Sequence, residues 1–396
     1  MNEANHLSII GLSYGDPWHP ATWSNNPYYL FSNLKEMGYL DFAWGENSLR
    51  FHNYLARIMS AFRFTTIKKR EIGHLAPRFF QSHILNKKFR RVLENNQSPE
   101  GGNNRVVLST SSFVGLDNIP YPVYLYGDQN FYQFYKGNPD IREAISPRIL
   151  QQIIDFEKRQ SDRCEGIFCF SRWMKDSIVN DYGIDEKKVA VVGHGYCLPE
   201  YEDFDKREYE EPIMLCVVTN WKKKGGDIVL KAFRMVKEHL PEIQLHIVGR
   251  LPETVSLKMK NQDIIYHGFL NKNKPEELAK LISLYKKAAV FVLPSVFDPM
   301  PNITLEANYL KTPVVTSNVC GIPEQVIEGE TGFIIDEFEA ERYAEKILLL
   351  LNDRELRLKM GQRGRAFVEE NYSWRIVINK MLEHMNLDFD YIHLDN

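Results

Sequence analysis

Residues 289–317 read AVFVLPSVFDPMPNITLEANYLKTPVVTS, and the order of apolar and polar segments in this stretch predicts the fold class. The apolar run 289–295 is rich in β-branched and aromatic residues and indicates a buried strand. After a Pro-rich turn, a short helix is expected from about Ile303, and 313–317 indicates a second strand. A strand, a helix and a strand in so short a span are typical of a parallel sheet with crossover connections.

The same alternation of strands and helices extends from this stretch in both directions. In the second half we expect strands at 213–218, 243–249, 264–269 and 332–335, and helices from Asp227, from Pro275 and at 338–352, 354–370 and 373–385. In the first half we expect strands at 7–11, 105–109, 121–126, 166–170 and 189–192. The predicted fold class is therefore α/β, with two Rossmann-like, doubly wound sheets.

The segment 199–212, PEYEDFDKREYEEP, is acidic and nearly free of aliphatic residues, so we expect it to link two domains. This predicts a Rossmann-like domain at 1–198, a second one at 213–372, and a C-terminal helix and tail at 373–396. Two such domains would face each other across a cleft. Ligands of these sheets bind outside the carboxyl ends of the strands, so the loops that follow strands are the candidate sites.

Composition excludes several classes of protein. With 44% hydrophobic and 26% charged residues, the 396-residue chain is typical of globular proteins. No run approaches the ~18 apolar residues of a membrane-spanning helix, and the first residues lack a signal-peptide pattern. The cysteines lack metal-ligand spacing and indicate buried thiols in a reducing compartment. We therefore expect a cytoplasmic protein.

The segment 50–91 is strongly basic, although the formal net charge of the whole chain is only −3. It contains eleven Lys or Arg residues and one acid, Glu71. A solvated helical face and a surface for an anionic partner both fit such a segment. Large apolar residues interleave with the charges, which favours the headgroup layer of an anionic membrane over nucleic acid. We therefore expect peripheral membrane contact through 50–91 and no nucleic-acid binding.

The segment NWKKKGGD, residues 220–227, stands between a predicted strand and a predicted helix. Its lysines provide positive charge, and its glycines allow close backbone approach beside the free N–H groups of a helix N-terminus. This combination favours a phosphate or diphosphate over the alternative, an exposed basic turn. It lacks the G-x-x-x-x-G-K-[ST] spacing of a P-loop.

Two carboxylates, Asp298 and Glu306, stand at the ends of DPMPNITLE. Helix capping is one interpretation, but if Asn302 is the capping residue, a capping box needs an acid at position 305, which is leucine. The other interpretation is a pair of carboxylates that accept hydrogen bonds from the hydroxyls of a sugar or ribose. Spacing alone does not choose between the two.

The run 289–335 resembles the donor-site core of glycosyltransferase family 4, whose members are retaining enzymes with the GT-B fold. The motifs that carry the resemblance are Pro-Ser at 294–295, two acids separated by seven residues, Pro-Val-Val at 313–315, Gly-Ile-Pro-Glu at 321–324 and Thr-Gly at 331–332. In addition, 220–227 is similar to the Lys-Gly loop of this family. The resemblance spans most of 165–375 and, more loosely, 7–40 and 121–135.

The resemblance implies roles for individual donor-site residues. Lys224 would hold the donor diphosphate, Glu306 would bind the ribose, and Asp298, where the family has glutamate, would lie against the donor sugar. Thr219 replaces the usual arginine five positions before the lysine, so Lys222 or Lys223 would supply the second positive charge. The other expected donor-binding residues are Gly225, Gly226, Phe269, Pro301, Asn302 and Ile303.

The resemblance also implies an acceptor side in the first domain. Ser24, Asn25 and Asn26 occupy a loop where relatives often carry glycines, and Asn tolerates a left-handed backbone. Asp128 stands near the position of a histidine that many relatives place beside the reacting sugar. Asp128, Lys224 and Asp298 are therefore the expected catalytic residues.

The implied function is a hexosyl or related transferase that moves a sugar from a nucleotide diphosphate to a hydroxyl of a glycan or lipid-linked acceptor, as in polysaccharide biosynthesis. We expect no cofactor and no metal, because the D-x-D triplets at 203–205 and 388–390 lie in the linker and the tail. The alternatives are another GT-B enzyme of nucleotide sugars, such as an epimerase, and a non-catalytic relative that binds an anionic surface. The pairing of the Lys224 loop with Asp298 and Glu306 favours the transferase.

Overall fold

The computed structural model describes residues 7–19, 22–46, 75–96, 104–111, 115–206, 211–256 and 263–385. The chain divides into two units. The first consists of Met1–Gly195 and Trp374–Asn396, and the second of Tyr196–Ser373.

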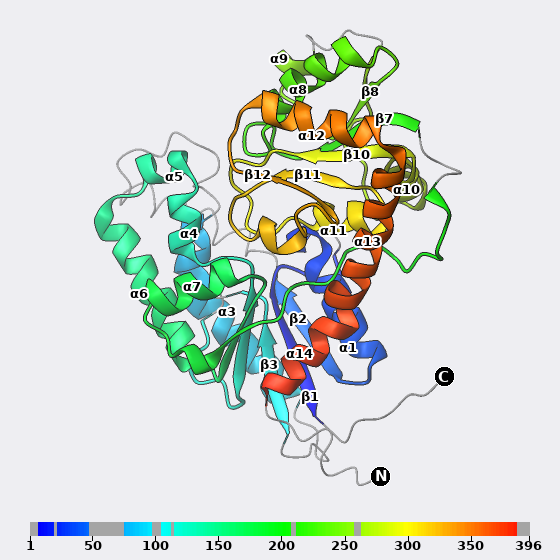
Figure 1. Cartoon of the computed structure of the whole chain (residues 1–396). Coiled ribbons are helices and arrows are strands. Elements are labelled where there is room, and N and C mark those ends of the chain that lie inside the picture. The colour runs from blue at the N-terminus through cyan, green and yellow to red at the C-terminus, as the bar shows by residue number, and fades with distance from the viewer. Residues whose placement is uncertain are drawn as a thin grey trace. The chain divides into compact units, whose positions relative to one another are not determined.

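Within its described residues, the first unit contains a parallel six-stranded sheet in the order β2-β1-β3-β4-β5-β6 (Figure 1). Its strands are β1 (Ser8–Tyr14), β2 (Leu40–Glu46), β3 (Arg105–Ser109), β4 (Val123–Gly127), β5 (Gly166–Cys169) and β6 (Val189–Val191). Its helices are η2 (Thr22–Asn25), α1 (Asn26–Glu36), α3 (Leu75–Asn95), α4 (Phe131–Lys136), α5 (Pro139–Ala144), α6 (Pro147–Arg163), α7 (Arg172–Asn180), η4 (Glu186–Lys188) and α14 (Trp374–His384). Strands β1, β3 and β5 are apolar along most of their length because helices bury both faces of a parallel sheet.

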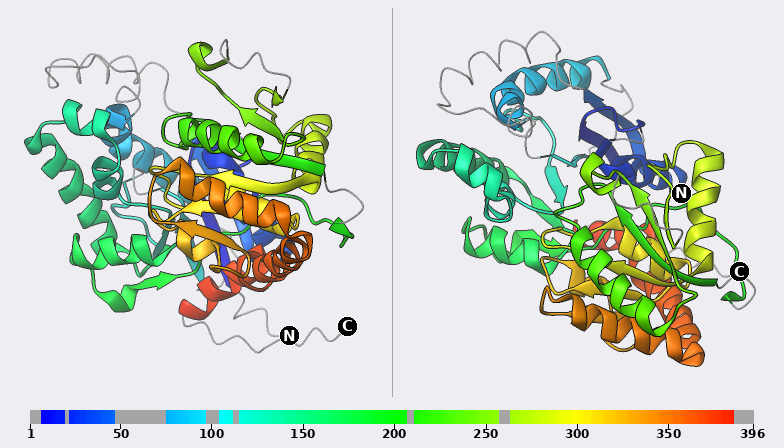
Figure 2. Two further views of the ribbon diagram at one scale, coloured as in Figure 1. Left: turned by 45° about the horizontal axis from the view of Figure 1, so that its top comes forward. Right: turned by 90° about the horizontal axis from the view of Figure 1, so that it is seen from above.

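The described part of the second unit contains another parallel six-stranded sheet, in the order β12-β11-β10-β7-β8-β9. Its strands are β7 (Glu211–Val218), β8 (Gln244–Gly249), β9 (Ile264–Tyr266), β10 (Ala288–Leu293), β11 (Val314–Ser317) and β12 (Gly332–Ile335). Its helices are α8 (Gly226–His239), α9 (Glu253–Ser256), α10 (Pro275–Lys287), α11 (Asn302–Tyr309), η6 (Ile322–Gln325), α12 (Ala340–Asn352) and α13 (Arg354–Tyr372). Helices α8 and α12 lie side by side on this unit (Figure 2) and share its core with the sheet.

The last described helix, α14, belongs to the first unit and contacts α1. Its Trp374 packs flat on the backbone of Gly195, where an added Cβ would lie 2.3 Å from the indole ring. This close approach requires glycine at position 195. The expected return of the C-terminal helix to the first domain is confirmed.

Three strands of the first unit differ from the sequence-based expectation. Strand β1 extends to Tyr14, three residues beyond the expected end. Strand β2 was not predicted; it lies at the edge of the sheet and its described side chains are partly exposed, so it lacks a clear apolar pattern. Strand β4 begins at Val123, two residues later than expected, directly after Pro122, which has no N–H to donate to a neighbouring strand.

The described part of the acidic segment 199–212 belongs to the second unit. Lys206 is buried, and its Nζ donates to Tyr285 O at 2.8 Å and to Thr312 Oγ1 at 2.9 Å. Asp203 is 67% exposed, as expected of a solvated acid, but it also pairs with Lys311 Nζ at 2.6 Å. The triplet at 388–390 lies outside the described residues.

The basic segment 50–91 is described only from residue 75 onward, within α3. In this helix Leu85, Phe89 and Leu93 are buried in the core of the first unit, whereas Lys87 and Arg91 are exposed. Leu85 and Phe89 therefore pack in the core, and the argument that interleaved apolar residues indicate a membrane does not hold for these two. Among the described helices, none has the length and apolar character required to cross a membrane.

Candidate active site

Strand order identifies one switch point in each sheet, where successive crossovers leave in opposite directions. It lies between β1 and β3 in the first unit and between β7 and β10 in the second. Loops at the carboxyl ends of such strand pairs form the usual ligand site of doubly wound sheets. Most predicted site residues follow the strands at these two places, whereas Asp128 follows β4 and Phe269 follows β9.

In the second unit, the lysine loop after β7 packs against the loop after β10. The Val296 N–H donates to Lys223 O at 2.8 Å and joins the two loops. Gly225 has φ +66°, and an added Cβ would lie 1.9 Å from Pro294 O. Gly226 lies under the Trp221 ring, which a Cβ would approach to 2.2 Å. Both predicted glycines are thus required by close contacts at the N-terminus of α8.

Lys224 and Asp298, from these two loops, form an ion pair in which 15% and 14% of the side chains are exposed. Burial lowers the pKa of Lys224 to about 8, and the electrostatic effect of Cys216 opposes this shift. The geometry joins a cation and a carboxylate that the sequence had placed 74 positions apart. Lys222 is exposed and Lys223 is half-buried.

Glu306 lies on α11 with none of its side chain exposed. Pro301 stands at the N-cap and provides no side-chain hydrogen bond, so α11 begins at Asn302 without a cap from either. Glu306 Oε1 forms an ion pair with Lys272, and Tyr285 OH donates to Oε2 at 3.4 Å. Glu306 therefore does not act as a capping residue, and the capping alternative is wrong.

Lys272 and Tyr285 were missed by sequence reasoning. Nothing in the local sequence separates Lys272 from Lys274, which is 57% exposed and pairs with Glu277. Of the remaining predicted donor residues, Asn302 and Ile303 are half-buried. Phe269 is 48% exposed and lies beneath the Arg250 guanidinium at 4.8 Å.

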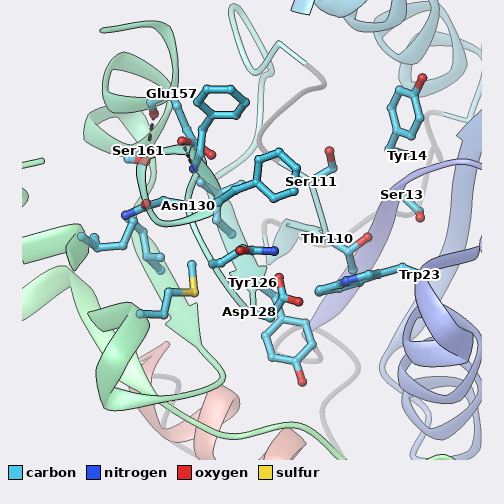
Figure 3. Close-up of a pocket in the computed structure, with 18 residues that line it drawn as sticks. Ser13, Tyr14, Trp23, Thr110, Ser111, Tyr126, Asp128, Asn130, Glu157 and Ser161 are labelled. Atoms are coloured by element: carbon cyan, nitrogen blue, oxygen red, sulfur yellow. Dashed lines mark hydrogen bonds between the residues drawn. The ribbon is translucent and has the colours of Figure 1, made fainter. Parts of the chain in front are cut away.

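The first unit has a pocket of about 360 Å³ at the carboxyl ends of β1, β3 and β4 (Figure 3). It is lined by hydroxyls, carboxylates and aromatic rings, among them Ser13, Trp23, Thr110, Tyr126, Asp128 and Glu157. Figure 3 shows the Asp128 carboxylate turned toward Trp23, with Glu157 and Ser161 on the opposite side of the pocket.

Burial raises the pKa of Asp128 from 3.8 to about 6, although hydrogen bonds from the Trp23 side chain and from backbone N–H groups favour its ionised form. Beside it, Gln129 Oε1 is buried and accepts no hydrogen bond from any described residue. These two side chains provide acceptor oxygens, which suit a ligand rich in hydroxyl groups.

The loop beside this pocket has a left-handed backbone at three successive residues. Trp23, Ser24 and Asn25 have φ of 42°, 55° and 73°, and Asn26 begins α1. Such angles cost roughly 1–2 kcal/mol for each non-glycine residue. Packing of the Trp23 ring on Phe170, with centroids 5.2 Å apart, offsets part of this strain.

Glu157 is a pocket residue that sequence reasoning missed. Its Oε2 accepts from the Phe131 N–H at 2.8 Å and from Tyr182 OH. These contacts hold the first turn of α4 against α6. Glu157 therefore positions the wall of the pocket, while Asp128 remains the carboxylate available to a ligand.

Residues 200–367 match the family described as glycosyl transferases group 1. The matched segment is less than half of the chain. It contains Lys224, Lys272, Asp298 and Glu306, and the resemblance found in the sequence is confirmed at this level. Assignment to family 4 specifically remains a prediction.

Two relatives match about half of the chain or somewhat more. The chain is 30% identical over 227 residues to the capsular polysaccharide biosynthesis glycosyltransferase CapM of Staphylococcus aureus, covering 53% of this chain and 58% of CapM. It is 26% identical over 262 residues to the D-inositol 3-phosphate glycosyltransferase of Corynebacterium efficiens, covering 61% of this chain and 59% of that protein. The chain thus spans less than two thirds of the length of either relative.

Solved structures match nearly the whole chain. Sucrose-phosphate synthase from Thermosynechococcus elongatus has a TM-score of 0.71 and 17% identity, covering 96% of this chain and 99% of that protein. Anabaena Alr3699/HepE in complex with UDP and glucose has a TM-score of 0.62 and 12% identity, covering 96% and 100%. The chain has the GT-B fold, as predicted. A cleft between its two units remains a prediction.

Proposed function

We propose that the chain is a retaining glycosyltransferase that moves a hexosyl or related group from a nucleotide diphosphate to an acceptor hydroxyl. The observation that carries the proposal is that Lys224, Asp298 and Glu306 stand in two lysine–carboxylate pairs after β7 and β10, the strands of the second switch point. The names of the relatives and the UDP and glucose bound by HepE support it.

In this proposal Lys224 and the N-terminus of α8 bind the donor diphosphate. Negative charge on the diphosphate increases as the glycosidic bond breaks, and a lysine beside free N–H groups stabilises that charge. The leaving group then needs no metal ion.

Asp298 would contact the hydroxyls of the donor sugar, and Glu306 those of the ribose. Each carboxylate is already paired with a lysine, so its charge is balanced before the donor binds. Ionised acceptors make stronger hydrogen bonds to hydroxyls than neutral ones do. Lys222 or Lys223 would provide further positive charge at the edge of the same loop.

The pocket of the first unit would hold the acceptor. Asp128 and Gln129 would accept hydrogen bonds from acceptor hydroxyls, with Ser24, Asn25 and Asn26 on the neighbouring loop. Retention would follow from attack on the face that the diphosphate leaves, with the departing phosphate helping to take the acceptor proton. The name of CapM supports an acceptor in polysaccharide biosynthesis. We propose further that this acceptor is a surface glycan or a lipid-linked one at the cytoplasmic face of a membrane.

The decisive experiment is a thermal-shift screen against UDP-, GDP- and ADP-sugars, followed by an assay of hydrolysis or transfer with the sugar that binds. A ligand at ~100 times its dissociation constant should add about 2.7 kcal/mol of stability. Turnover that keeps the anomeric configuration would support the proposal. Binding without turnover would favour a non-catalytic relative. A sugar whose configuration changes while it stays attached to the nucleotide would favour an epimerase.

A further inference from the structure

Glu306 is a buried carboxylate whose charge must be balanced inside the protein. None of its side chain is exposed, and an isolated ion in such a place is strongly unfavourable. Among the described residues, the cation paired with it is Lys272, whose Nζ contacts Oε1. Tyr285 OH reaches the other oxygen at 3.4 Å, which is long for a hydrogen bond of this type.

The loop that carries Lys272 is held in place by its own hydrogen bonds. It joins β9 to α10, and the Asn271 N–H donates to Glu277 Oε2 at 2.6 Å. The Lys274 N–H donates to Asn271 O at 3.0 Å, which closes a turn around Lys272. Lys272 therefore points to Glu306, while Lys274 points to solvent.

The ion pair keeps unused hydrogen-bonding capacity. A carboxylate has about four acceptor sites and an ammonium has three N–H groups, and their mutual contact uses only part of each. Lys272 retains 19% exposure whereas Glu306 has none, so a ligand that reaches Glu306 also meets Lys272. The buried Cys197 thiol nearby adds no charge, because burial raises its pKa.

We propose that Lys272 and Glu306 act as one unit that binds the ribose side of the donor nucleotide. Lys272 pairs with the buried carboxylate and orients it, and its remaining N–H groups bind ligand oxygens. It adds a cation at the ribose side of the donor site to those of the lysine loop after β7. This inference rests on the proposed function and adds a positioning residue to it.

The test is a double-mutant cycle on nucleotide affinity, measured by calorimetry with UDP, GDP and ADP. The variants are Lys272→Met, Glu306→Gln and the double variant, with Lys272→Arg as the conservative replacement. Lys274→Met is the matched control, because it removes an exposed lysine two positions away in the same loop. The double variant contains no unpaired buried charge, so it should fold even if Lys272→Met does not.

We expect Lys272→Met and Glu306→Gln each to weaken nucleotide binding by about tenfold or more. The double variant should bind the nucleotide at least as tightly as the single variant with the lower affinity. Lys272→Arg should restore most of the affinity, and Lys274→Met should leave it unchanged. If the double variant binds as well as the wild type, or if the two effects simply add, the inference is wrong although the enzyme proposal survives. If the wild type binds none of the three nucleotides, the proposed function itself is wrong.

Discussion

Burial determines the charge state of single residues at both sites. In the second unit, Lys224 is largely removed from water and its ammonium is balanced by Asp298. In the first unit, Asp128 is retained as a carboxylate in a pocket that raises its pKa. Perturbed groups of this kind concentrate at functional sites because the same burial strengthens their interaction with a ligand.

Lys224→Ala should lower kcat by about 10²–10³-fold and weaken nucleotide binding by less than tenfold. The reason is that charge on the diphosphate grows toward the transition state, so the lysine stabilises that state more than the ground state. Steady-state kinetics and nucleotide calorimetry measure the two effects. Lys231→Ala, an exposed lysine on α8, is the control. Equal losses in kcat and in nucleotide affinity would show that Lys224 contributes to binding alone and not to the transition state.

Asp128→Asn should raise stability at pH 7.5 by roughly 1–2 kcal/mol, a range reduced for the partial exposure of this side chain. The folded pKa of about 6 exceeds the usual 3.8, so the native state binds more protons between these values. The free energy of unfolding of the wild type should therefore fall as the pH rises from about 4 to about 6. This loss of stability should persist at higher pH.

Thermal melts at pH 4.5 and 7.5 test this, because the advantage of Asp128→Asn should be much smaller at the lower pH. Wild-type transfer should also decline below about pH 6, as the carboxylate gains its proton. A melting difference that does not change with pH would show that Asp128 has no raised pKa.

At the scale of elements, the donor site depends on two loops that touch. The lysine loop after β7 and the loop after β10 meet because their strands are neighbours in the sheet. Gly225 permits this contact by a left-handed backbone directly against Pro294 O. Strands that are consecutive in space but not in sequence thus bring Lys224 to Asp298.

Gly225→Ala should destabilise the second unit by about 2–4 kcal/mol and weaken nucleotide binding, since the new methyl group would separate the loops. The matched control is Gly268→Ala. Gly268 has a similar φ of +72°, but beyond its chain neighbours no described atom lies within 4 Å of the place an added Cβ would take. Only the backbone cost of about 1 kcal/mol is therefore expected there. Chemical denaturation measures both, and similar losses would show that the contact with Pro294 is unimportant.

At the scale of the whole molecule, the basic segment 50–91 remains the proposed contact with a membrane. The described part of it contributes exposed Lys87 and Arg91 from α3, while Leu85 and Phe89 are buried in the core. The membrane contact that we propose for the exposed residues of α3 is therefore electrostatic. Each basic residue near an anionic surface contributes about 1 kcal/mol, and salt weakens this attraction.

The wild type should float with anionic liposomes at low salt and dissociate as salt rises. Changing Lys68, Lys69, Arg70, Lys87, Lys88, Arg90 and Arg91 to Gln should abolish flotation, whereas Lys231→Gln with Arg234→Gln on α8 should not. If the wild type fails to bind at low salt, the basic segment serves a soluble acidic acceptor or only solvates the surface.

Much of the architecture could be predicted from the sequence because buried parallel strands are apolar along their whole length. Strand β10 is entirely buried, and its neighbours in the second sheet are similar, so their order along the chain indicated a doubly wound fold. The short spacing of Asp298 and Glu306 around one turn likewise made their loop recognisable. These features depend on local periodicity, which a sequence displays directly.

Only the tertiary structure decided which distant residues meet. Lys272 pairs with Glu306 across 34 positions, and Trp23 reaches Asp128 from a loop near the N-terminus. Strand β2 was also missed, because its edge position is set by the tertiary structure. At the edge its side chains are partly exposed, so the sequence shows no regular apolar pattern there. Pairing of this kind depends on strand order and on burial, which turn one lysine inward and leave its neighbour in water.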